Sequence, residues 1–314
     1  MLLGILVVYL HTGTFDLVAL RARGGQDFAL GLQQILFLAF FVAFAIKVPV
    51  FPFHTWLPDA HSDAPTPISV LLAGVLLKMG GYGLFRIGFP LFPAAARWFI
   101  PALIALGVIN IVYGALVAMA QTDFKRLVAY SSVSHMGFVL LGLASLTPQG
   151  MNGALLQMFN HGIITGAMFL LVGVLYERAH TRDLNAFGGL GVRVPVYAAM
   201  LIFFSLASLG LPGLAGFVSE FLSLVGAFGP WGVYTTVSVL GIVAAAAYML
   251  KVIQQVLLGP LNEKRRGMPD MTSWELMTVA PLLVLVLALG VYPLLMLHLQ
   301  DPALLRLIAH VLGR

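Results

Sequence analysis

Long apolar stretches separated by short polar connections run along the whole chain of 314 residues. A helix needs about 20 mostly apolar residues to cross the ~30 Å hydrocarbon core of a membrane. By this measure the pattern predicts about nine membrane-spanning helices, and no connection is long enough to fold as a separate domain. The expected spans are residues 1–12, 28–58, 65–90, 98–120, 127–147, 151–177, 195–229, 231–258 and 274–299.

Two of the predicted spans are too long for one straight crossing. A helix of about 30 residues would extend ~45 Å at 1.5 Å per residue, well beyond the membrane core. Residues 28–58 contain the run KVPVFPF and residues 195–229 contain SLGLPGLAGF, so proline and glycine interrupt both. We therefore expect two discontinuous helices whose freed backbone groups line a cavity, as at the ion sites of secondary transporters.

Composition indicates an integral membrane protein and argues against nucleic-acid binding and cysteine-dependent sites. Hydrophobic residues make up 60% of the chain and charged residues 9%, against about a quarter charged residues in soluble domains. The net charge is +5, and the basic residues lie at the ends of apolar stretches rather than in a patch, so nucleic acid is not an expected partner. There is no cysteine, which excludes disulfides and cysteine-ligated iron–sulfur or zinc sites on this chain.

Positive charges in the connections favour one orientation by a narrow margin. Lysine and arginine collect in the cytoplasmic connections of membrane proteins. Over alternate connections, eight such residues fall on one face and six on the other, which favours the first face as cytoplasmic. The first face holds Lys125, Arg126, Arg178, Arg182, Arg193, Lys264, Arg265 and Arg266, and the second holds Arg21, Arg23, Arg86, Arg97, Arg306 and Arg314.

Ionisable residues also occur inside the predicted spans, where a charge costs about 2.5–3.5 kcal/mol or more. Lys78 lies near the middle of its span, and Lys47 and Glu220 lie beside the two expected breaks. Each could form a structural ion pair between helices, or could gain and lose a proton as its surroundings change. Lys251 lies about two turns before the end of its span, near enough for its side chain to reach the membrane surface.

Two histidines lie on consecutive predicted spans. The sequence predicts that His135 in AYSSVSHMGF and His161 in LLQMFNHGIITG each share one face of their helix with polar neighbours, which form a polar stripe around His161. Imidazole accepts and releases protons near neutral pH, so the pair could carry protons between lysines and a carboxylate. The alternative is that each is a buried histidine with satisfied hydrogen bonds. The polar neighbours are Ser131 and Ser134 for His135, and Gln157 and Thr165 for His161.

Together, five ionisable side chains lie one to a span on five helices. We expect them to form a buried polar axis that moves protons across the membrane. We expect no cofactor and no metal on this chain. Their order in space does not follow from the sequence. The five residues are Lys47, Lys78, His135, His161 and Glu220.

Several long motifs resemble those of one family of membrane proteins. The stretches KVPVFPFHTWLPDAHSDAPTPISVLLAGVLLKMGGYG, DFKRLVAYSSVSHMGF and LPGLAGFVSEF occur in this order, and the likeness covers essentially the whole chain. The chain resembles the chain M family of antiporter-like subunits in bacterial respiratory complex I, the NADH-quinone oxidoreductase. The stretches SSVSHMGF and MFNHG favour this family over related subunits of multi-subunit cation/proton antiporters and membrane-bound hydrogenases.

The resemblance implies an all-α polytopic membrane fold of two antiporter-like bundles with inverted topology, each with one discontinuous transmembrane helix. Residues 1–92 would form the remainder of the first bundle, residues 93–260 the second, and residues 261–314 a C-terminal transmembrane helix and tail. Members of the family begin with several further helices, one of which carries a glutamate that pairs with the position of Lys47. We therefore expect those N-terminal helices to be lacking here.

The resemblance also implies a function in the inner membrane of the cell. Chain M subunits translocate protons while quinone is reduced elsewhere in the complex, so no redox chemistry is expected on this chain. The expected partners are the other membrane subunits of complex I and the lipid bilayer. By the same likeness, Lys47 and Lys78 match the lysines of the first bundle. His135 and His161 match the linking histidines of the second bundle, and Glu220 its terminal glutamate, which exchanges protons with the periplasmic side.

The sequence is also compatible with other functions. The chain could belong to a cation/proton antiporter or a membrane-bound hydrogenase on the same fold, and the proteins that co-purify with it would decide this. It could be a membrane cytochrome with His135 and His161 as haem ligands, but that leaves the lysines and Glu220 without a role. It could also be a nonfunctional remnant that serves only as an anchor.

Overall fold

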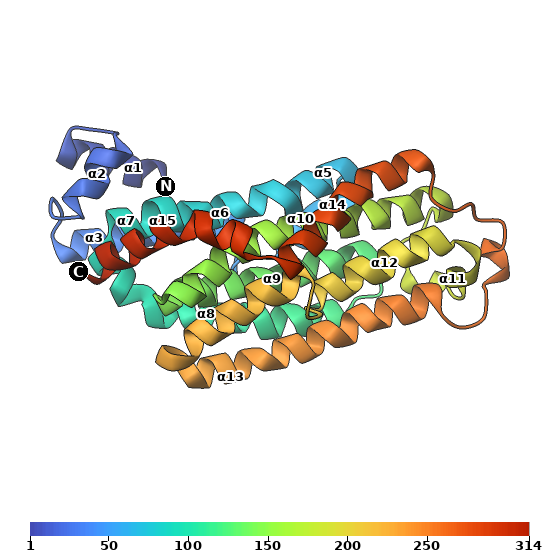
Figure 1. Cartoon of the computed structure of the whole chain (residues 1–314). Coiled ribbons are helices and arrows are strands. Elements are labelled where there is room, and N and C mark those ends of the chain that lie inside the picture. The colour runs from blue at the N-terminus through green and yellow to red at the C-terminus, as the bar shows by residue number, and fades with distance from the viewer. Residues whose placement is uncertain (314) are drawn as a thin grey trace.

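The computed structural model describes residues 1–313 as an elongated bundle in which most helices run along one common direction (Figure 1). Short π-helical (η1, η2) and 3-10 (η3, η4) segments interrupt or join the α-helices. The elements are α1 (Leu2–Thr12), α2 (Leu17–Arg23), α3 (Leu30–Lys47), α4 (Trp56–Asp63), α5 (Thr66–Leu71), η1 (Leu72–Leu76), α6 (Leu77–Gly83), η2 (Leu84–Gly88), α7 (Phe89–Leu91), α8 (Pro93–Ala120), α9 (Phe124–Ser145), α10 (Pro148–Ala179), η3 (Leu184–Ala186), α11 (Leu190–Arg193), α12 (Pro195–Ser208), α13 (Ala215–Leu257), η4 (Glu263–Arg265), α14 (Ser273–Val291) and α15 (Leu294–Leu312).

The expected all-α polytopic membrane fold is confirmed. Within residues 1–313, seven helices are long and apolar enough to cross a membrane, and the pair α1 and α2, bent by 69°, would make an eighth. The sequence pattern predicted about nine, because α13 takes in the second half of the predicted span 195–229 and nearly all of the predicted span 231–258. Its 43 residues form two helices that meet at a kink at Trp231, directly after Pro230. Proline removes a helical hydrogen bond and forces this kink.

The first expected break lies between α3 and α4, at residues 48–55. Asn110 of α8 reaches the unwound backbone there. Its Nδ2 donates to the carbonyl of Pro49 at 3.1 Å, and its Oδ1 accepts from the backbone N–H of Phe51 at 2.8 Å. Asn110 is fully buried. One buried amide therefore satisfies two backbone groups that the break leaves without helical partners.

The second expected break lies between α12 and α13, at residues 209–214. Gly210 and Gly213 have φ angles of 83° and 92°, a left-handed backbone that glycine adopts without steric cost. Asn160 of α10 donates from Nδ2 to the carbonyl of Ala215 at 2.7 Å. Both predicted discontinuous helices are therefore present. They start from opposite ends of the bundle (Figure 1), as inverted topology requires.

Helices α9 and α10 form the centre of the bundle. Their most apolar windows are 94% and 83% buried, whereas the corresponding window of α14 is 17% buried. α10 contacts α5, α9, α12, α13, α14 and α15. Because protein surrounds these two helices, their polar side chains face other helices rather than lipid. His135 of α9 and His161 of α10 are placed by this arrangement in the interior.

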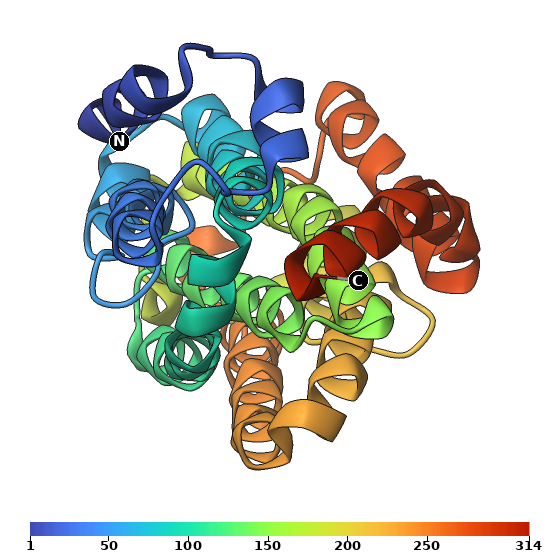
Figure 2. The ribbon, with the colours of Figure 1, turned by 90° about the vertical axis from the view of Figure 1, so that its left-hand side faces the viewer.

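The bundle has two distinct ends. Figure 2 looks onto the end that carries both termini. At the other end, the connections between α8 and α9, α10 and α11, and α13 and α14 are tied together by backbone hydrogen bonds, such as that from Phe124 to Arg182 at 2.9 Å. The last residues, expected as a tail, form α15, which packs against α7, α8 and α10. The bundle boundaries placed at residues 92 and 260 stay predictions.

Candidate functional site

Four of the five predicted site residues come together in the middle of the bundle, where α6, α9, α10 and α13 meet. His135, His161 and Glu220 are 5%, 3% and 5% exposed, and Lys78 is half-buried. Each side chain comes from a different helix. Four of the five residues predicted for the polar axis therefore form a row of neighbours in the order Lys78, His161, His135 and Glu220.

Lys78 and His161 form the first contact of this row. Nζ of Lys78 lies 2.6 Å from Nδ1 of His161 and also donates to the carbonyl of Ala73 in η1. A π-helical turn such as η1 moves backbone carbonyls away from their α-helical partners, and such turns are frequent at functional sites. Glycines allow the two helices to approach: a Cβ on Gly162 would lie 3.0 Å from the carbonyl of Gly74.

His135 and Glu220 form the second contact. Nδ1 of His135 lies 2.7 Å from Oε1 of Glu220, and Nε2 lies 3.2 Å from the hydroxyl of Ser208 and 3.4 Å from that of Tyr248. The same carboxylate oxygen accepts from Nε2 of Gln157 at 3.1 Å. A buried carboxyl group must be paired, protonated or hydrated, and Glu220 has two protein donors.

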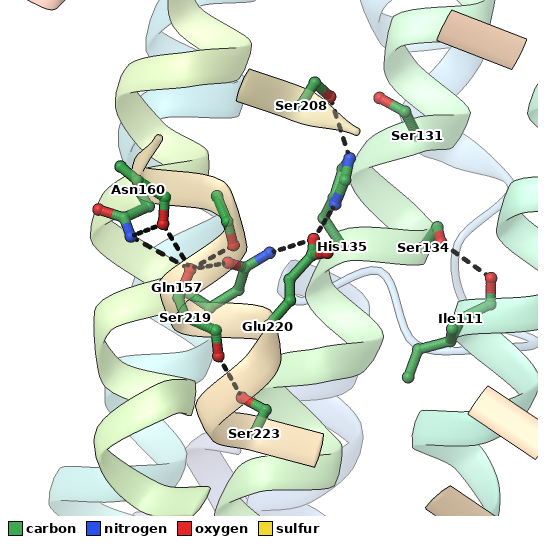
Figure 3. A network of polar contacts seen from close by, with 12 residues as sticks. Ile111, Ser131, Ser134, His135, Gln157, Asn160, Ser208, Ser219, Glu220 and Ser223 are labelled. Carbon is green, nitrogen blue, oxygen red and sulfur yellow. Dashed lines mark hydrogen bonds and ion pairs between the residues drawn. The ribbon is translucent and has the colours of Figure 1, made fainter. Parts of the chain in front are cut away.

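A side-chain network on α10 and α13 orients Gln157 toward the carboxylate (Figure 3). The hydroxyl of Ser219 donates to Oε1 of Gln157 at 2.5 Å, and Nδ2 of Asn160 donates to Ser219 at 3.1 Å. Because the amide oxygen of Gln157 is engaged, its NH₂ group faces Glu220. Such a network specifies one arrangement of the buried polar groups.

A small cavity lies between the two histidines, with about 200 Å³ of empty space. The two ring centroids are 5.7 Å apart. Nε2 of His161 has no hydrogen-bond partner within residues 1–313. A buried water needs two to four polar partners, and the cavity wall offers them. The polar lining residues are His135, Gln157, His161, Thr165, Ser208 and Glu220, which confirms the polar stripe predicted on α10.

Lys47 does not join this cluster. It is the last residue of α3, and its side chain is exposed on the bundle surface. Its Cβ nevertheless lies against α6, where a Cβ on Gly80 would approach it to 2.8 Å. Gly80 is two residues beyond Lys78 on the same helix. The part of Lys47 in proton translocation stays a prediction.

The polar face expected beside His135 is only partly present. Ser134 turns away and donates to the carbonyl of Ile111 on α8 at 2.8 Å (Figure 3). That expectation was wrong because adjacent residues on a helix point about 100° apart. Lys251 donates to the carbonyls of Met119 and Gln121 at the end of α8, at 2.9 and 3.1 Å. It caps a neighbouring helix and takes no part in the cluster.

His61 of α4 was not among the site residues predicted from the sequence. It is fully buried, and its ring stacks on Phe169 of α10 with the centroids 4.4 Å apart. Neither ring nitrogen has a hydrogen-bond partner in the described part of the chain. The ammonium groups of Lys78 and Lys125 lie within electrostatic range of it. The motif HTWLPDAH could have indicated it, because it places His54 within the first break and His61 seven residues later in the helix that follows.

His61 lies between the central cluster and a second cavity at the end of the bundle without the termini. Phe169 is eight residues from His161 and seven from Tyr176 on α10, or roughly 12 Å and 10 Å along the helix. Tyr176 lines the second cavity, which has about 630 Å³ of empty space. Lys125, almost fully buried in its wall, donates to the carbonyl of Ala64 at 2.5 Å. The other polar lining residues are Ser62, Asp63, Thr66 and Arg182.

The geometry argues against the two histidines as haem ligands. Both ring nitrogens of His135 face protein partners, Glu220 on one side and the hydroxyls on the other. No group of three or more potential metal-ligating residues occurs within residues 1–313. The absence of any cofactor on this chain stays a prediction.

What the cluster can do is pass protons. Ammonium, imidazole and carboxyl groups are in hydrogen-bond contact at two points, and a polar cavity lies between them. An imidazole can accept a proton on one ring nitrogen and release one from the other. The buried row has no exposed nucleophile. The contacts in the row allow a proton to pass from one of these groups to the next.

Comparison with known proteins places this geometry in a family. Residues 1–247 match the family described as NADH:quinone oxidoreductase/Mrp antiporter, transmembrane. The chain is 46% identical over 321 residues to NADH-quinone oxidoreductase subunit M of Rhodobacter capsulatus, a match that covers 98% of this chain and 62% of the relative. It is 43% identical over 308 residues to NAD(P)H-quinone oxidoreductase chain 4 of Acaryochloris marina, with 95% and 57% covered. The chain thus spans about three fifths of the length of these relatives.

Two solved structures share the fold. A chain of respiratory complex I from Thermus thermophilus with bound NADH is 36% identical, with a TM-score of 0.92, and the match covers 99% of this chain and 66% of that chain. A chain of the Mrp complex from Dietzia sp. DQ12-45-1b is 24% identical, with a TM-score of 0.86 and 99% and 67% covered. The second likeness concerns the fold alone.

The predicted resemblance to chain M is confirmed, because the relatives include proteins named subunit M. The family match extends over well more than half of the chain. The chain therefore belongs to the NADH:quinone oxidoreductase/Mrp antiporter transmembrane family.

Proposed function

We propose that this chain is a proton-translocating membrane subunit of an NADH-quinone oxidoreductase, working with the other membrane subunits of that complex in a bacterial inner membrane. NADH oxidation and quinone reduction take place elsewhere, and this chain moves only protons. The observation that carries the proposal is the buried row from Lys78 through His161 and His135 to Glu220, which joins four helices in the middle of the bundle.

Proton transfer begins between Lys78 and His161. Charged Lys78 donates to Nδ1 of His161, so neutral His161 carries its hydrogen on Nε2. When Lys78 passes its proton to Nδ1, His161 releases the proton on Nε2 into the polar cavity. A single water in that cavity carries it to His135, whose Nδ1 faces Glu220 at 2.7 Å.

Electrostatic repulsion makes the transfer sequential. Lys78 and His161 are 2.6 Å apart in a buried site, where two positive charges repel far more strongly than in water. His161 therefore gains a proton only as Lys78 becomes neutral. A charge change beside either end of the row shifts the protonation of its neighbour, which couples this chain to events in an adjacent subunit.

Protons reach Lys78 from the cavity that Lys125 lines. His61 lies between the two and has both ring nitrogens free of partners in the described residues. A buried polar group without a partner is costly, and such costs persist where they serve function. His61 thus relays protons from the end of the bundle to Lys78. By the loop charges, this end is the cytoplasmic one.

A cation/proton antiporter is the second candidate function on this fold. The likeness to the Mrp complex, at 24% identity, supports the shared fold and nothing finer. The relatives at 46% and 43% identity are named as quinone oxidoreductase subunits. These names favour the quinone oxidoreductase.

The test is to tag the chain in the cells that encode it and to purify what it assembles with under mild detergent. We expect NADH-quinone oxidoreductase subunits to co-purify, and vesicles that contain the assembly to acidify when NADH and quinone are added. Co-purification with antiporter subunits, together with sodium-driven proton exchange that needs no NADH, would contradict the proposal.

A further inference from the structure

A positively charged hollow lies at the end of the bundle that carries the termini, between α2, η2 and α15. It has about 1030 Å³ of empty space. Three arginines from three separate elements line it: Arg21 from α2, Arg86 from η2 and Arg306 from α15. His310 completes its polar lining and donates to the carbonyl of Pro90 at 2.8 Å, which holds α15 beside the end of α7.

No carboxylate compensates these three arginines in the part of the chain that the structure describes. The lining of the hollow holds no aspartate or glutamate. The ion pairs of residues 1–313 involve other arginines, such as Arg23 with Asp27 at this end. Nε of Arg306 donates to the carbonyl of Pro302 at 2.9 Å, which leaves the outer nitrogens of its guanidinium free. Guanidinium groups bind phosphate through two parallel hydrogen bonds.

An apolar groove continues from the charged hollow toward the middle of the membrane. A second hollow shares Arg21, Arg86 and Ala303 with the first, and a third shares Tyr82 and Leu155 with the second. The groove therefore follows α6 on one side and α15 on the other. Its apolar lining includes Phe85, Leu304 and Leu307 in the second hollow and Val75, Met79, Phe159, Ile163 and Met296 in the third.

The length of the groove matches one leaflet of a bilayer. Arg86 and Val75 are eleven residues apart on one helical column, or roughly 16 Å at 1.5 Å per residue. Half of the ~30 Å hydrocarbon core is about 15 Å. Val75, Met79 and Tyr82 are all more than half exposed along this path. A charged group at the membrane surface and an acyl chain below it would thus fit the hollow and the groove together.

We propose that this surface binds one anionic phospholipid, with its phosphate on Arg21, Arg86 and Arg306 and an acyl chain along the groove between α6 and α15. Charge complementarity fixes the headgroup class, because basic pockets between membrane helices bind anionic headgroups. The third hollow also exposes one side of Lys78. The acyl chain covers that side and keeps water away from Lys78 except along the polar row.

The test measures phospholipid retained by the purified assembly that contains the chain, by native mass spectrometry, after exchange into detergent with defined lipids. We expect one anionic phospholipid to be retained and zwitterionic phosphatidylcholine to be lost. Removing two positive charges with R86Q and R306Q together should weaken binding of the anionic lipid roughly 25-fold. The matched control is R97Q, at the same end of the bundle but outside the hollow.

A second variant separates the acyl groove from the charges. Ala303 is exposed and lines both the charged and the apolar hollow. A303W fills the groove without removing an arginine, and it should also release the lipid. Lipid binding to the unaltered protein should weaken as salt is raised, which tests the site even if a variant does not fold.

Three results would overturn the proposal. One is equal retention of the anionic phospholipid by R86Q/R306Q, A303W and the unaltered protein. Another is equal binding of phosphatidylcholine. The third is full competition by inorganic phosphate at low millimolar concentration, which would make this a site for free phosphate rather than for a lipid.

Discussion

At the scale of single residues, the proposed proton path depends on hydrogen-bond contacts between ionisable side chains. Lys78 and His161 are in contact, and so are His135 and Glu220, while a polar cavity of about 200 Å³ lies between the pairs. His61 extends the row toward the cavity that Lys125 lines. Removing any one of these side chains should interrupt proton movement with little effect on the fold.

His61 offers the sharpest residue-level test, because His54 is its matched control. Both histidines are buried, and both have ring nitrogens without partners among residues 1–313. His54 packs among Phe51, Tyr113 and Tyr130, away from the polar row. H61F keeps an aromatic ring against Phe169 but cannot carry a proton. Since positioned acid–base groups contribute about 10²–10⁴-fold, proton translocation by the assembled complex should fall by about a hundredfold or more.

H54F should leave translocation close to that of the unaltered complex. Proton release on addition of NADH and quinone, followed with a pH-sensitive dye in sealed vesicles, measures both variants. Equal losses in the two variants, or none in H61F, would remove His61 from the proposed path.

The sequence predicted most of this site. Lys78, His135, His161 and Glu220 were found because ionisable groups are rare and costly in apolar spans. His61 was missed because α4 is a short, polar helix of eight residues, so its histidine does not stand out from its neighbours. The exposed position of Lys47 could not be foreseen either, because packing against other segments decides which face of a helix is covered.

At the scale of the elements, the two breaks depend on asparagines from neighbouring helices. Asn110 satisfies two backbone groups beside Pro49 and Phe51, and Asn160 donates to the carbonyl of Ala215 at the start of α13. Proline and glycine predicted where the helices break. The asparagines could not be predicted as their partners, because these contacts join residues about 60 positions apart in the chain.

The break between α3 and α4 should be sensitive to the loss of Asn110. N110A leaves the carbonyl of Pro49 and the N–H of Phe51 buried without partners. An unsatisfied buried group costs about 1–3 kcal/mol, so the free energy of unfolding should fall by roughly 2–4 kcal/mol. Reversible unfolding in detergent micelles, followed by circular dichroism, measures this change.

N185A is the control for that experiment, because Asn185 is exposed, and its bonds are to Asp183 in its own turn and one long contact of 3.5 Å from Gln255. It should change the free energy of unfolding by less than about 0.5 kcal/mol. If N110A were as stable as N185A, Asn110 would not hold the break.

At the scale of the whole molecule, α14 is attached to the central bundle through few buried residues, because only 17% of its apolar window is buried. A two-pronged ion pair anchors its first turn: Nη1 and Nη2 of Arg178 lie 2.7 Å from the two carboxylate oxygens of Glu275. Arg178 also donates to the carbonyls of Pro269 and Asp270. This one residue at the end of α10 therefore fixes the connection between α13 and α14.

Replacing Arg178 should loosen this connection without affecting the polar row. R178Q cannot donate to both carboxylate oxygens, so residues 258–272 should become more sensitive to protease and the assembly should lose about 1–3 kcal/mol of stability. R266Q is the matched control, because Arg266 and Glu263 form a highly exposed pair of the kind that contributes little. Equal protease sensitivity in the two variants would show that the Arg178 pair does not anchor α14.

The overall architecture followed from hydrophobic periodicity and from two interrupted spans, because these patterns depend on local sequence. The kink at Trp231 in α13 separates two helices, and it lies at the predicted boundary between the crossings 195–229 and 231–258. The approach of α2, η2 and α15 around the three arginines was not predicted. It depends on residues more than 200 positions apart in the chain, such as His310 and Pro90.

The most direct test of the central claim is the number of protons translocated per NADH oxidised by the complex that contains this chain, with K78M compared with K251M. Lys251 is also a lysine within a span, but it caps α8 and lies outside the row. We predict that K78M lowers the proton-to-NADH ratio below that of K251M and of the unaltered complex, each corrected for its rate of NADH oxidation. A ratio in K78M equal to that of the unaltered complex would contradict a proton path through Lys78.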